Sequence, residues 1–173
     1  AKSNKVSMKM YIIEKNLLEY LIEECVARGS NDFVRDILLK KLDRLKIYGY
    51  PYEGYLARID SISTYYRYNM ELLNPEIRSE LFFKSGLIYT KIKSEVPAKY
   101  SESAQVENCI LFRGVKVYKG AKIKNSIIMQ DVEIQENAVL DHVILDKDVV
   151  LKRGRTLIGQ EHYPVVIGKG ESV

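Results

Sequence analysis

Residues 106–156 read VENCILFRGVKVYKGAK (106–122), IKNSIIMQDVEIQENAV (123–139) and LDHVILDKDVVLKRGRT (140–156) when they are written in rows of 17. Three aliphatic columns run through these rows, at spacings of five, six and six residues. The columns are Val106/Ile123/Leu140/Leu157, Leu111/Ile128/Leu145 and Val117/Ile134/Leu151. This spacing drifts off the 3.6-residue period of an amphipathic helix, so the rows predict short strands instead.

A second set of columns indicates which way the strands face and where the chain turns. In an extended segment, residues i and i−2 point to the same side, so each inward aliphatic is paired with a compact neighbour. These neighbours are Cys109/Ser126/Val143, Val115/Val132/Val149 and Ala121/Ala138. Residues that favour turns separate the strands: Gly114/Asp131/Asp148, Gly120/Asn137/Gly154 and Asn108/Asn125/His142. Three strands and three corners per row predict a triangular prism of coils stacked about 4.8 Å apart.

The fourth row, LIGQEHYPVVIGKGESV (157–173), departs from the pattern. It slips by one residue at Ile167 and places His162 in an aliphatic column, while Arg155 interrupts a column of small residues. Such departures are expected of a terminal capping coil, because its outer face has no neighbouring coil to match.

Upstream of the repeat, the sequence predicts alternating strands and helices. Helices are expected at about 15–28, where Gly29 would cap the C-terminus, after an N-cap at Asn31 or Asp32, and at 62–73 after an N-cap at Ser61. Strands are expected at 9–13, 47–50 and 55–59. The alternation favours part of a three-layer α/β sheet that would be short of partners, so we expect a C-terminal fragment of a longer protein.

The composition excludes several classes of protein. The chain of 173 residues is long enough for one large domain or two small ones. Because 27 basic residues are nearly matched by 23 acidic ones, with no basic stripe, nucleic-acid binding is not expected. The absence of an apolar run of about 18 residues and of a signal segment argues against a membrane protein. Cys25 and Cys109 cannot form a metal cluster by themselves and favour reduced, cytosolic thiols.

Several segments, taken in order, resemble one enzyme family. Residues 61–73, SISTYYRYNMELL, are similar to a helix written T-I-D-S-Y-Y-E-A-N-M-D-L-L in that family. Residues 50–55, YPYEGY, look like its YPFEGYW segment, and residues 96–100, VPAKY, look like its PPAKF linker. The chain thereby resembles the C-terminal half of bacterial ADP-glucose pyrophosphorylases, the glucose-1-phosphate adenylyltransferases of glycogen synthesis.

The resemblance implies a fold and a domain organisation. Residues 1–74 would be the C-terminal part of a Rossmann-like α/β nucleotidyltransferase domain, and residues 75–103 a linker. Residues 104–173 would form a left-handed parallel β-helix of hexapeptide-type repeats. The handedness comes from the resemblance and runs against the usual right-handed crossover preference.

One position departs from the pattern of the catalytic members. They read G-Y-W-x-D-[VI]-G-T, and the aspartate helps to hold the catalytic magnesium. In this chain residues 54–61 read GYLARIDS, so Arg58 stands at the position of the metal-binding aspartate and Asp60 replaces the glycine. A cation beside Mg²⁺ turns attraction into a repulsion of about 4 kcal/mol at ~4 Å and an effective dielectric near 20. Nucleotidyl transfer depends on metal positioning, so the resemblance implies a non-catalytic subunit. The fragment alone is expected to be inactive, because the family's glycine-rich nucleotide loop is absent from it.

The implied role is regulatory and structural, in glycogen biosynthesis in the cytoplasm. The subunit would assemble with a catalytic ADP-glucose pyrophosphorylase subunit into a homo- or hetero-oligomer, such as a mixed tetramer. It would modulate the conversion of ATP and glucose 1-phosphate to ADP-glucose and pyrophosphate. Mg²⁺ is expected in the catalytic partner, and no cofactor is expected in this fragment. A candidate site for an anionic effector consists of Arg113, Lys116, Lys119 and Lys122, although an ordinary solvated face explains the same residues.

Two other functions stay open from the sequence. In one, the intact chain catalyses the transfer itself, with the metal held by residues upstream of this fragment. In the other, the chain is a hexapeptide-repeat acyltransferase with His142 as general base, which predicts a trimer whose acyl-CoA turnover His142→Ala abolishes. Asn108 and Asn125 share the column of His142, which favours a corner residue instead. Cys109 is interpreted as an inward-facing small residue rather than a nucleophile.

Overall fold

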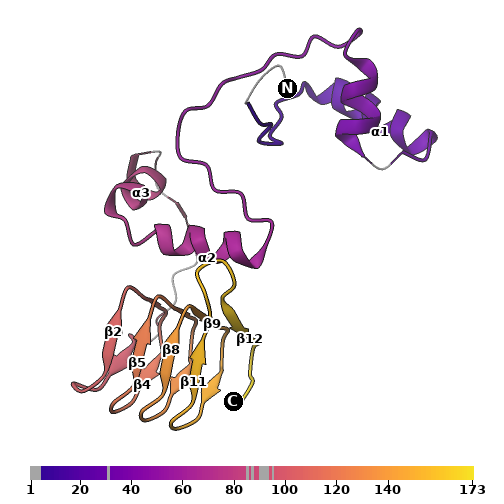
Figure 1. Cartoon of the computed structure of the whole chain (residues 1–173). Coiled ribbons are helices and arrows are strands. Elements are labelled where there is room, and N and C mark those ends of the chain that lie inside the picture. Colours follow the sequence, from indigo (N-terminus) through magenta and orange to yellow (C-terminus); the bar gives the residue numbers. More distant parts are fainter. Residues whose placement is uncertain (1–4, 31, 85, 87, 90–93, 95) are drawn as a thin grey trace. The chain divides into compact units, whose positions relative to one another are not determined.

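The computed structural model of the chain describes residues 5–30, 32–84, 86, 88–89, 94 and 96–173. The chain divides into two compact units, Ala1–Glu53 and Gly54–Val173, which are described in turn below (Figure 1). None of the helices in the described ranges is long and apolar enough to cross a membrane.

The unit Gly54–Val173 contains a stack of short parallel strands (Figure 1). The strands are β1 (Lys99–Tyr100), β2 (Gln105–Glu107), β3 (Ile110–Leu111), β4 (Lys116–Val117), β5 (Lys122–Lys124), β6 (Ile127–Ile128), β7 (Glu133–Ile134), β8 (Val139–Asp141), β9 (Val143–Leu145), β10 (Val150–Leu151), β11 (Thr156–Ile158) and β12 (Val165–Ile167). They form three four-stranded sheets, in the orders β1-β4-β7-β10, β11-β8-β5-β2 and β12-β9-β6-β3. Successive strands belong to different sheets, so this part is a parallel β-solenoid of about four turns.

The strand register confirms the 17-residue rows in the first three coils. Ile123 lies opposite Val106 and Leu140, and Ile128 lies opposite Leu111 and Leu145. All nine residues predicted at corners have positive φ: Asn108, Gly114, Gly120, Asn125, Asp131, Asn137, His142, Asp148 and Gly154. Most side chains are strained in that conformation, whereas Gly, Asn, Asp and His adopt it more readily. The corner residues therefore determine where each coil turns.

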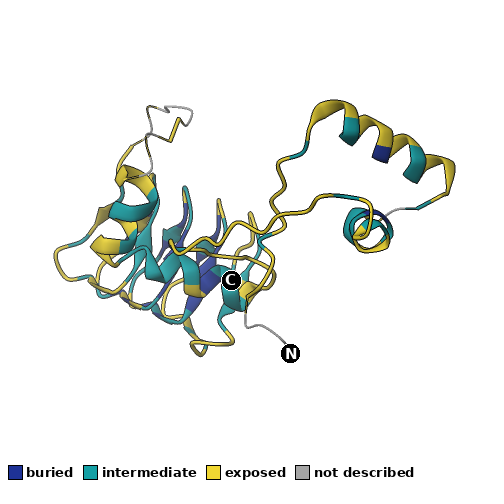
Figure 2. Ribbon diagram, turned by 90° about the horizontal axis from the view of Figure 1, so that it is seen from above, coloured by how far each residue is buried: buried dark blue, intermediate teal, exposed yellow. Residues whose placement is uncertain are grey.

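The aliphatic columns fill the interior of the solenoid, where segments of successive coils are dark blue in Figure 2. The buried residues that form this core are Val115, Val117, Ala121, Ile123, Ile128, Val132, Ile134, Ala138, Leu140, Val143, Leu145, Val149 and Leu151. Ser126 is buried with them, and its hydroxyl donates to the Lys124 carbonyl oxygen at 2.5 Å and accepts from the Val143 amide at 3.1 Å. Its polar group is thus satisfied inside an apolar core.

The predicted one-residue slip in the fourth coil is wrong. Ile167 lies opposite Leu145, a separation of 22 residues where the earlier coils keep 17. Five extra residues therefore enter this coil, and Ile167 belongs to the second aliphatic column rather than the third. His162 is exposed instead of inward-facing, because the extra residues form a turn outside the prism, closed by a bridge between Gln160 and Tyr163. Arg155 is also exposed.

The glycine that begins this turn is tightly packed. A β-carbon on Gly159 would lie 2.4 Å from the His142 carbonyl oxygen and 2.7 Å from the Val165 amide nitrogen. Gly159→Asn is therefore expected to lower the free energy of unfolding by about 1–3 kcal/mol, the usual cost of overpacking. In Gly154→Asn the new β-carbon meets no atom within 4 Å, and Asn137 already adopts the same corner conformation. Asparagine adopts positive φ more readily than most residues, so this control should lose less free energy of unfolding than Gly159→Asn in urea titrations; equal losses would contradict the prediction.

Capping residues mark the ends of the helices in the unit Ala1–Glu53. Helix α1 (Lys15–Ala27) is confirmed, and Gly29, with φ of 62°, follows its C-terminus. The amides of Gly29 and Ser30 donate to the carbonyls of Val26 and Cys25 at 3.1 and 3.0 Å, which closes the last turn. Asp32, one of the two predicted N-caps, caps the next helical segment. That segment is a π-helical turn, η1 (Phe33–Leu38), followed by a 3₁₀ turn, η2 (Leu39–Lys41).

The helical part of the unit Gly54–Val173 precedes the solenoid. Helix α2 (Ile62–Glu71) starts at the predicted N-cap, where Ser61 and Thr64 form a reciprocal capping box, and ends two residues before the predicted boundary. Asn74 then caps the short helix α3 (Pro75–Ser79), which has proline in its first turn. A π-helical turn, η3 (Glu80–Lys84), follows directly.

The strands predicted at 9–13, 47–50 and 55–59 are not formed, and no strand of a three-layer sheet is seen in the described residues before Lys99. A strand needs a neighbour for its backbone N–H and C=O groups. In the described ranges every strand ladder joins segments of the solenoid. Apolar residues in the three segments consequently remain exposed, among them Ile12, Tyr48 and Tyr50.

Candidate functional site

Helix α2 lies against one outer face of the solenoid, and Tyr66 makes the central contact (Figure 1). The side chain of Tyr66 is only 3% exposed and packs on Ile127 of β6 and Ile144 of β9. Its hydroxyl donates to the carbonyl oxygen of Asn125 at a corner. Burial, assisted by the charge of Asp141, raises the pKa of Tyr66 to about 12, so the phenol stays a donor through the neutral range.

A ladder of polar side chains runs along the corner that Tyr66 contacts. The amide nitrogen of Asn108 donates to Asn125 Oδ1 at 2.7 Å, and Asn125 Nδ2 donates to Asp141 Oδ1 at 2.9 Å. The same carboxylate oxygen lies 2.7 Å from Nδ1 of His142. The imidazole ring is tilted by 43° against the ring of Tyr66, at 6.1 Å between centroids. The corner residues of three coils are thereby linked to helix α2.

His142 is explained by its place at a corner of the solenoid rather than by a catalytic role. Its Nδ1 lies 2.7 Å from Asp141 Oδ1, so the carboxylate helps to position the imidazole ring. A general base must also reach a reacting group in a bound substrate. Neither the pocket nor the groove described below borders His142. His142 has a positive φ of 53°, which is typical of a turn residue. Asn108 and Asn125, which share its column in the repeat, also have positive φ, so the predicted corner role is confirmed.

Cys109 is half-buried next to the same corner. Its thiol donates to the carbonyl of Glu107, with an S–O distance of 3.0 Å, and lies 3.5 Å from the carbonyl oxygen of Ile123. Burial raises the pKa of the Cys109 thiol, and backbone hydrogen bonds of Ser126 and Glu107 oppose this only in part. The environment therefore favours the protonated thiol rather than a nucleophilic thiolate.

We expect Cys109 to react slowly with iodoacetamide in the folded protein. Because its pKa is raised, the thiolate fraction at pH 8 is smaller than for an ordinary cysteine, and alkylation should be several-fold slower than after unfolding in urea. The Cys25→Ser variant leaves Cys109 as the one remaining thiol, so mass spectrometry reports on it alone. Equal rates in the folded and unfolded states would show that the thiol is not shielded from the reagent and that its pKa is not raised.

Arg58 lies in the segment that leads into α2. Its Nε lies 4.0 Å from Asp60 Oδ2, with both side chains more than half exposed, so the contact is a screened surface pair. Upstream, the hydroxyl of Tyr55 donates to Glu71 at 2.5 Å, and its amide donates to Glu80 at 2.6 Å. Burial and the bond to Glu71 raise the pKa of Tyr55. The segment that carries Arg58 is thus tied to α2 and η3.

The four residues of the predicted anion site lie on one coil but on different faces. Lys116 belongs to β4 and Lys122 to β5, which are in separate sheets, while Arg113 and Lys119 precede two successive corners. Lys116 Nζ lies 2.6 Å from Glu133 Oε1, and this hydrogen bond raises the pKa of the ammonium group. Lys116 is therefore paired with the neighbouring coil, and the anion site stays a prediction.

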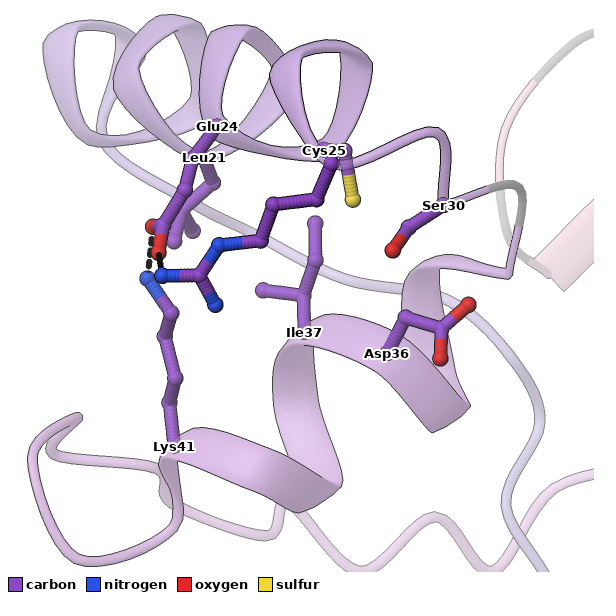
Figure 3. A pocket seen from close by; sticks show the side chains of 8 residues that line it. Leu21, Glu24, Cys25, Ser30, Asp36, Ile37 and Lys41 are labelled. Carbon is purple, nitrogen blue, oxygen red and sulfur yellow. Dashed lines mark hydrogen bonds and ion pairs between the residues drawn. The ribbon is translucent and has the colours of Figure 1, made fainter.

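A small pocket lies between α1 and η1, shown in Figure 3. Glu24 occupies its edge, where it pairs with Lys41 and, at 2.7 Å, with Arg28. The hydrogen bond from Lys41 lowers the pKa of Glu24. The volume of about 10 Å³ is that of a single water site, too small for a cofactor. Among the described residues, no group of three or more His, Cys, Asp and Glu side chains is arranged to hold a metal ion.

Comparison with known proteins places the repeat in a recognised class. A family model described as GlmU-like, C-terminal hexapeptide matches residues 92–163. The glycogen biosynthesis protein GlgD of Bacillus subtilis is 38% identical over 129 residues, which cover 66% of this chain and 37% of that protein. The glucose-1-phosphate adenylyltransferase of Fervidobacterium nodosum is 34% identical over 119 residues, or 68% of this chain and 29% of the enzyme. The chain thus spans about a third of the length of these relatives.

The similarity extends to further adenylyltransferases. The enzyme of Mycoplasma mobile is 35% identical over 121 residues, which cover 67% of this chain and 31% of the enzyme. These findings confirm the resemblance inferred from the segments around residues 50–55 and 61–73. The contact of Tyr66 with the corner was not predicted, because no short-range pattern indicates which solenoid face a helix covers.

Proposed function

We propose, from its similarity to GlgD and to the glucose-1-phosphate adenylyltransferases, that this chain is the C-terminal part of an adenylyltransferase-like subunit of glycogen biosynthesis. In this proposal it has a regulatory and assembly role and modulates the formation of ADP-glucose and pyrophosphate from ATP and glucose 1-phosphate. The observation that carries the non-catalytic assignment is Arg58, at the position of the family's metal-binding aspartate. Asp60 lies beside Arg58 in the structure, but a pair of opposite charges does not recreate an anionic ligand for Mg²⁺.

Three segments that form no strand in the described residues support the wider architecture of this proposal. Residues 9–13, 47–50 and 55–59 carry apolar side chains at strand-like positions, and several of these are exposed: Ile12, Tyr48, Tyr50, Leu56 and Ile59. We propose that they pair with strands from the remainder of the longer subunit, in a Rossmann-like nucleotidyltransferase domain. The solenoid is proposed to be left-handed, as in other hexapeptide-repeat proteins, since short coils of this type follow that rule.

The partner in this proposal is a catalytic adenylyltransferase subunit, in a mixed oligomer in the cytoplasm. Mg²⁺ would be bound by that partner, because the corresponding position in this chain is a cation. A second candidate keeps the metal bound by residues outside this chain, in which case the intact subunit is an active enzyme. The two candidates differ in what the subunit does without its partner.

The test measures pyrophosphate release from ATP and glucose 1-phosphate by the intact subunit, first alone and then with the catalytic subunit. Regulation predicts no turnover alone and a changed rate or effector response on mixing. Robust turnover by the wild-type subunit alone would overturn the regulatory proposal. Arg58→Asp and Arg58→Lys form a matched pair in the same assay. Only the aspartate can restore a metal ligand, so any activity gained should appear in Arg58→Asp and not in Arg58→Lys.

A further inference from the structure

The fourth coil carries a rigid projection, here called the coil-4 hairpin (residues 159–164). Gln160 and Tyr163 exchange two backbone hydrogen bonds, of 3.1 and 2.9 Å, which close its tip. Its base is held on both sides, because the Gly159 amide donates to the Asp141 carbonyl at 2.8 Å and the Val165 amide donates to the His142 carbonyl at 3.1 Å. The hairpin is therefore preorganised, and a contact through it would cost little further ordering.

An aromatic side chain stands at the tip of the coil-4 hairpin. Tyr163 is 80% exposed, and two residues of the flanking strands, Ile158 at the end of β11 and Val166 in the middle of β12, are also exposed. Glu161 adds a negative charge at the same tip. One exposed tyrosine needs no explanation in itself, but tyrosine is among the residues that most often anchor protein interfaces.

A groove lined by aromatic and basic side chains, complementary to the hairpin, lies at the other end of the solenoid, across β1 and β4. It has a volume of about 220 Å³ and is lined by Lys99, Tyr100, Ser101, Lys116, Val117 and Tyr118. Tyr100 and Tyr118 are 65% and 41% exposed, so both rings are available to a ligand. Pockets for drug-sized molecules start at about 300 Å³, so this groove suits a single large side chain better than a metabolite. Lys99 gives its rim a positive charge.

We propose that the coil-4 hairpin of one copy binds the groove of a second copy. Tyr163 would enter between Tyr100 and Tyr118, while Glu161 would approach Lys99 with the opposite charge. The two surfaces lie on the last and the first coils, so the contact is head-to-tail rather than two-fold symmetric. Such contacts extend into a row of molecules or close into a ring. This interaction surface goes beyond the proposed function, since it needs neither nucleotide nor catalytic partner.

Sedimentation velocity of the full chain over a series of concentrations tests the contact. Wild type should associate with rising concentration. Tyr163→Ala removes the projecting side chain and Tyr118→Ala removes a wall of the groove, and each should weaken association roughly 30-fold, as expected for an interface anchor. In an equimolar mixture of the two variants, the intact groove of Tyr163→Ala can bind the intact hairpin of Tyr118→Ala. The mixture should therefore form dimers and nothing larger.

Two controls separate this contact from loss of structure. Tyr50→Ala removes another highly exposed tyrosine, outside both surfaces, and should associate like wild type. A charge exchange, Glu161→Lys in one chain and Lys99→Glu in the other, should weaken each variant alone and restore the mixed pair. A wild-type chain that stays monomeric, or variants that associate normally, would overturn the proposal. Neither result would affect the pyrophosphate assay, which tests the proposed function separately.

Discussion

Ile128→Asp is expected to leave the solenoid unfolded at 25 °C. Ile128 is fully buried in the second aliphatic column, between Leu111 and Leu145 of the adjacent coils. Loss of the side chain alone costs about 2–5 kcal/mol, and burying an unpaired carboxylate costs several more. Because a domain of this size is stable by about 5–15 kcal/mol, the substitution removes most of that margin.

Far-UV circular dichroism and urea titration measure this effect. Ile62→Asp is the matched control, because Ile62 is 57% exposed and begins α2, where an acidic residue suits the helix dipole. The control should melt like wild type. An Ile128→Asp protein with wild-type dichroism and a wild-type urea midpoint would contradict the placement of this column inside the prism.

Tyr66→Ala is expected to release helix α2 from the solenoid. Truncation of a buried aromatic side chain costs about 3–5 kcal/mol, and here it uncovers Ile127 and Ile144 as well. Tyr66→Phe keeps the ring and loses only the hydroxyl that donates to Asn125, for about 1 kcal/mol. Hydrogen exchange of the α2 amides should accelerate strongly in the alanine variant and slightly in the phenylalanine variant. Equal exchange in all three proteins would show that α2 is not held by this contact.

The raised pKa of Tyr66 adds a pH dependence to the same pair of variants. In the unfolded chain a tyrosine loses its proton near pH 10, whereas folded Tyr66 keeps it to about pH 12. The folded state then binds more protons than the unfolded state, so stability falls as pH rises through this window. Tyr55 and Tyr65 shift in the same direction, so the loss should be smaller, but not absent, in Tyr66→Phe.

The solenoid was predictable because its determinants are local and repeated. Each corner needs a residue that tolerates positive φ, and each strand needs an inward aliphatic, so three rows specify the register. The insertion in the fourth coil gave no such signal. Val165 and Ile167 are aliphatic at strand-like spacing wherever the turn ends, so the rows alone could not separate a one-residue slip from five extra residues.

The first half was less predictable because strands depend on partners. Capping residues such as Asp32 and Ser61 act within their own turn. The sequence placed Ser61 correctly and predicted Asp32 as one of two alternatives, with Asn31. The segments 9–13 and 47–50 have strand-like patterns, but a pattern does not supply the neighbouring backbone. The same limit applies to the candidate site, since the contact of Tyr66 with Asn125 joins residues far apart in the sequence.

The nearest-neighbour stacking of the coils also bears on how the molecule would yield to mechanical force. A pull on the C-terminus loads one coil at a time, so the solenoid should peel rather than rupture as a whole. The last coil, lengthened by its hairpin, would release more chain than the 17-residue coils, each of which frees about 60 Å when extended. Because Tyr66 packs on Ile144 and Ile127, helix α2 spans two adjacent coils. The contact of α2 would have to break before these coils could unfold, so unfolding should pause there while the first coils remain folded.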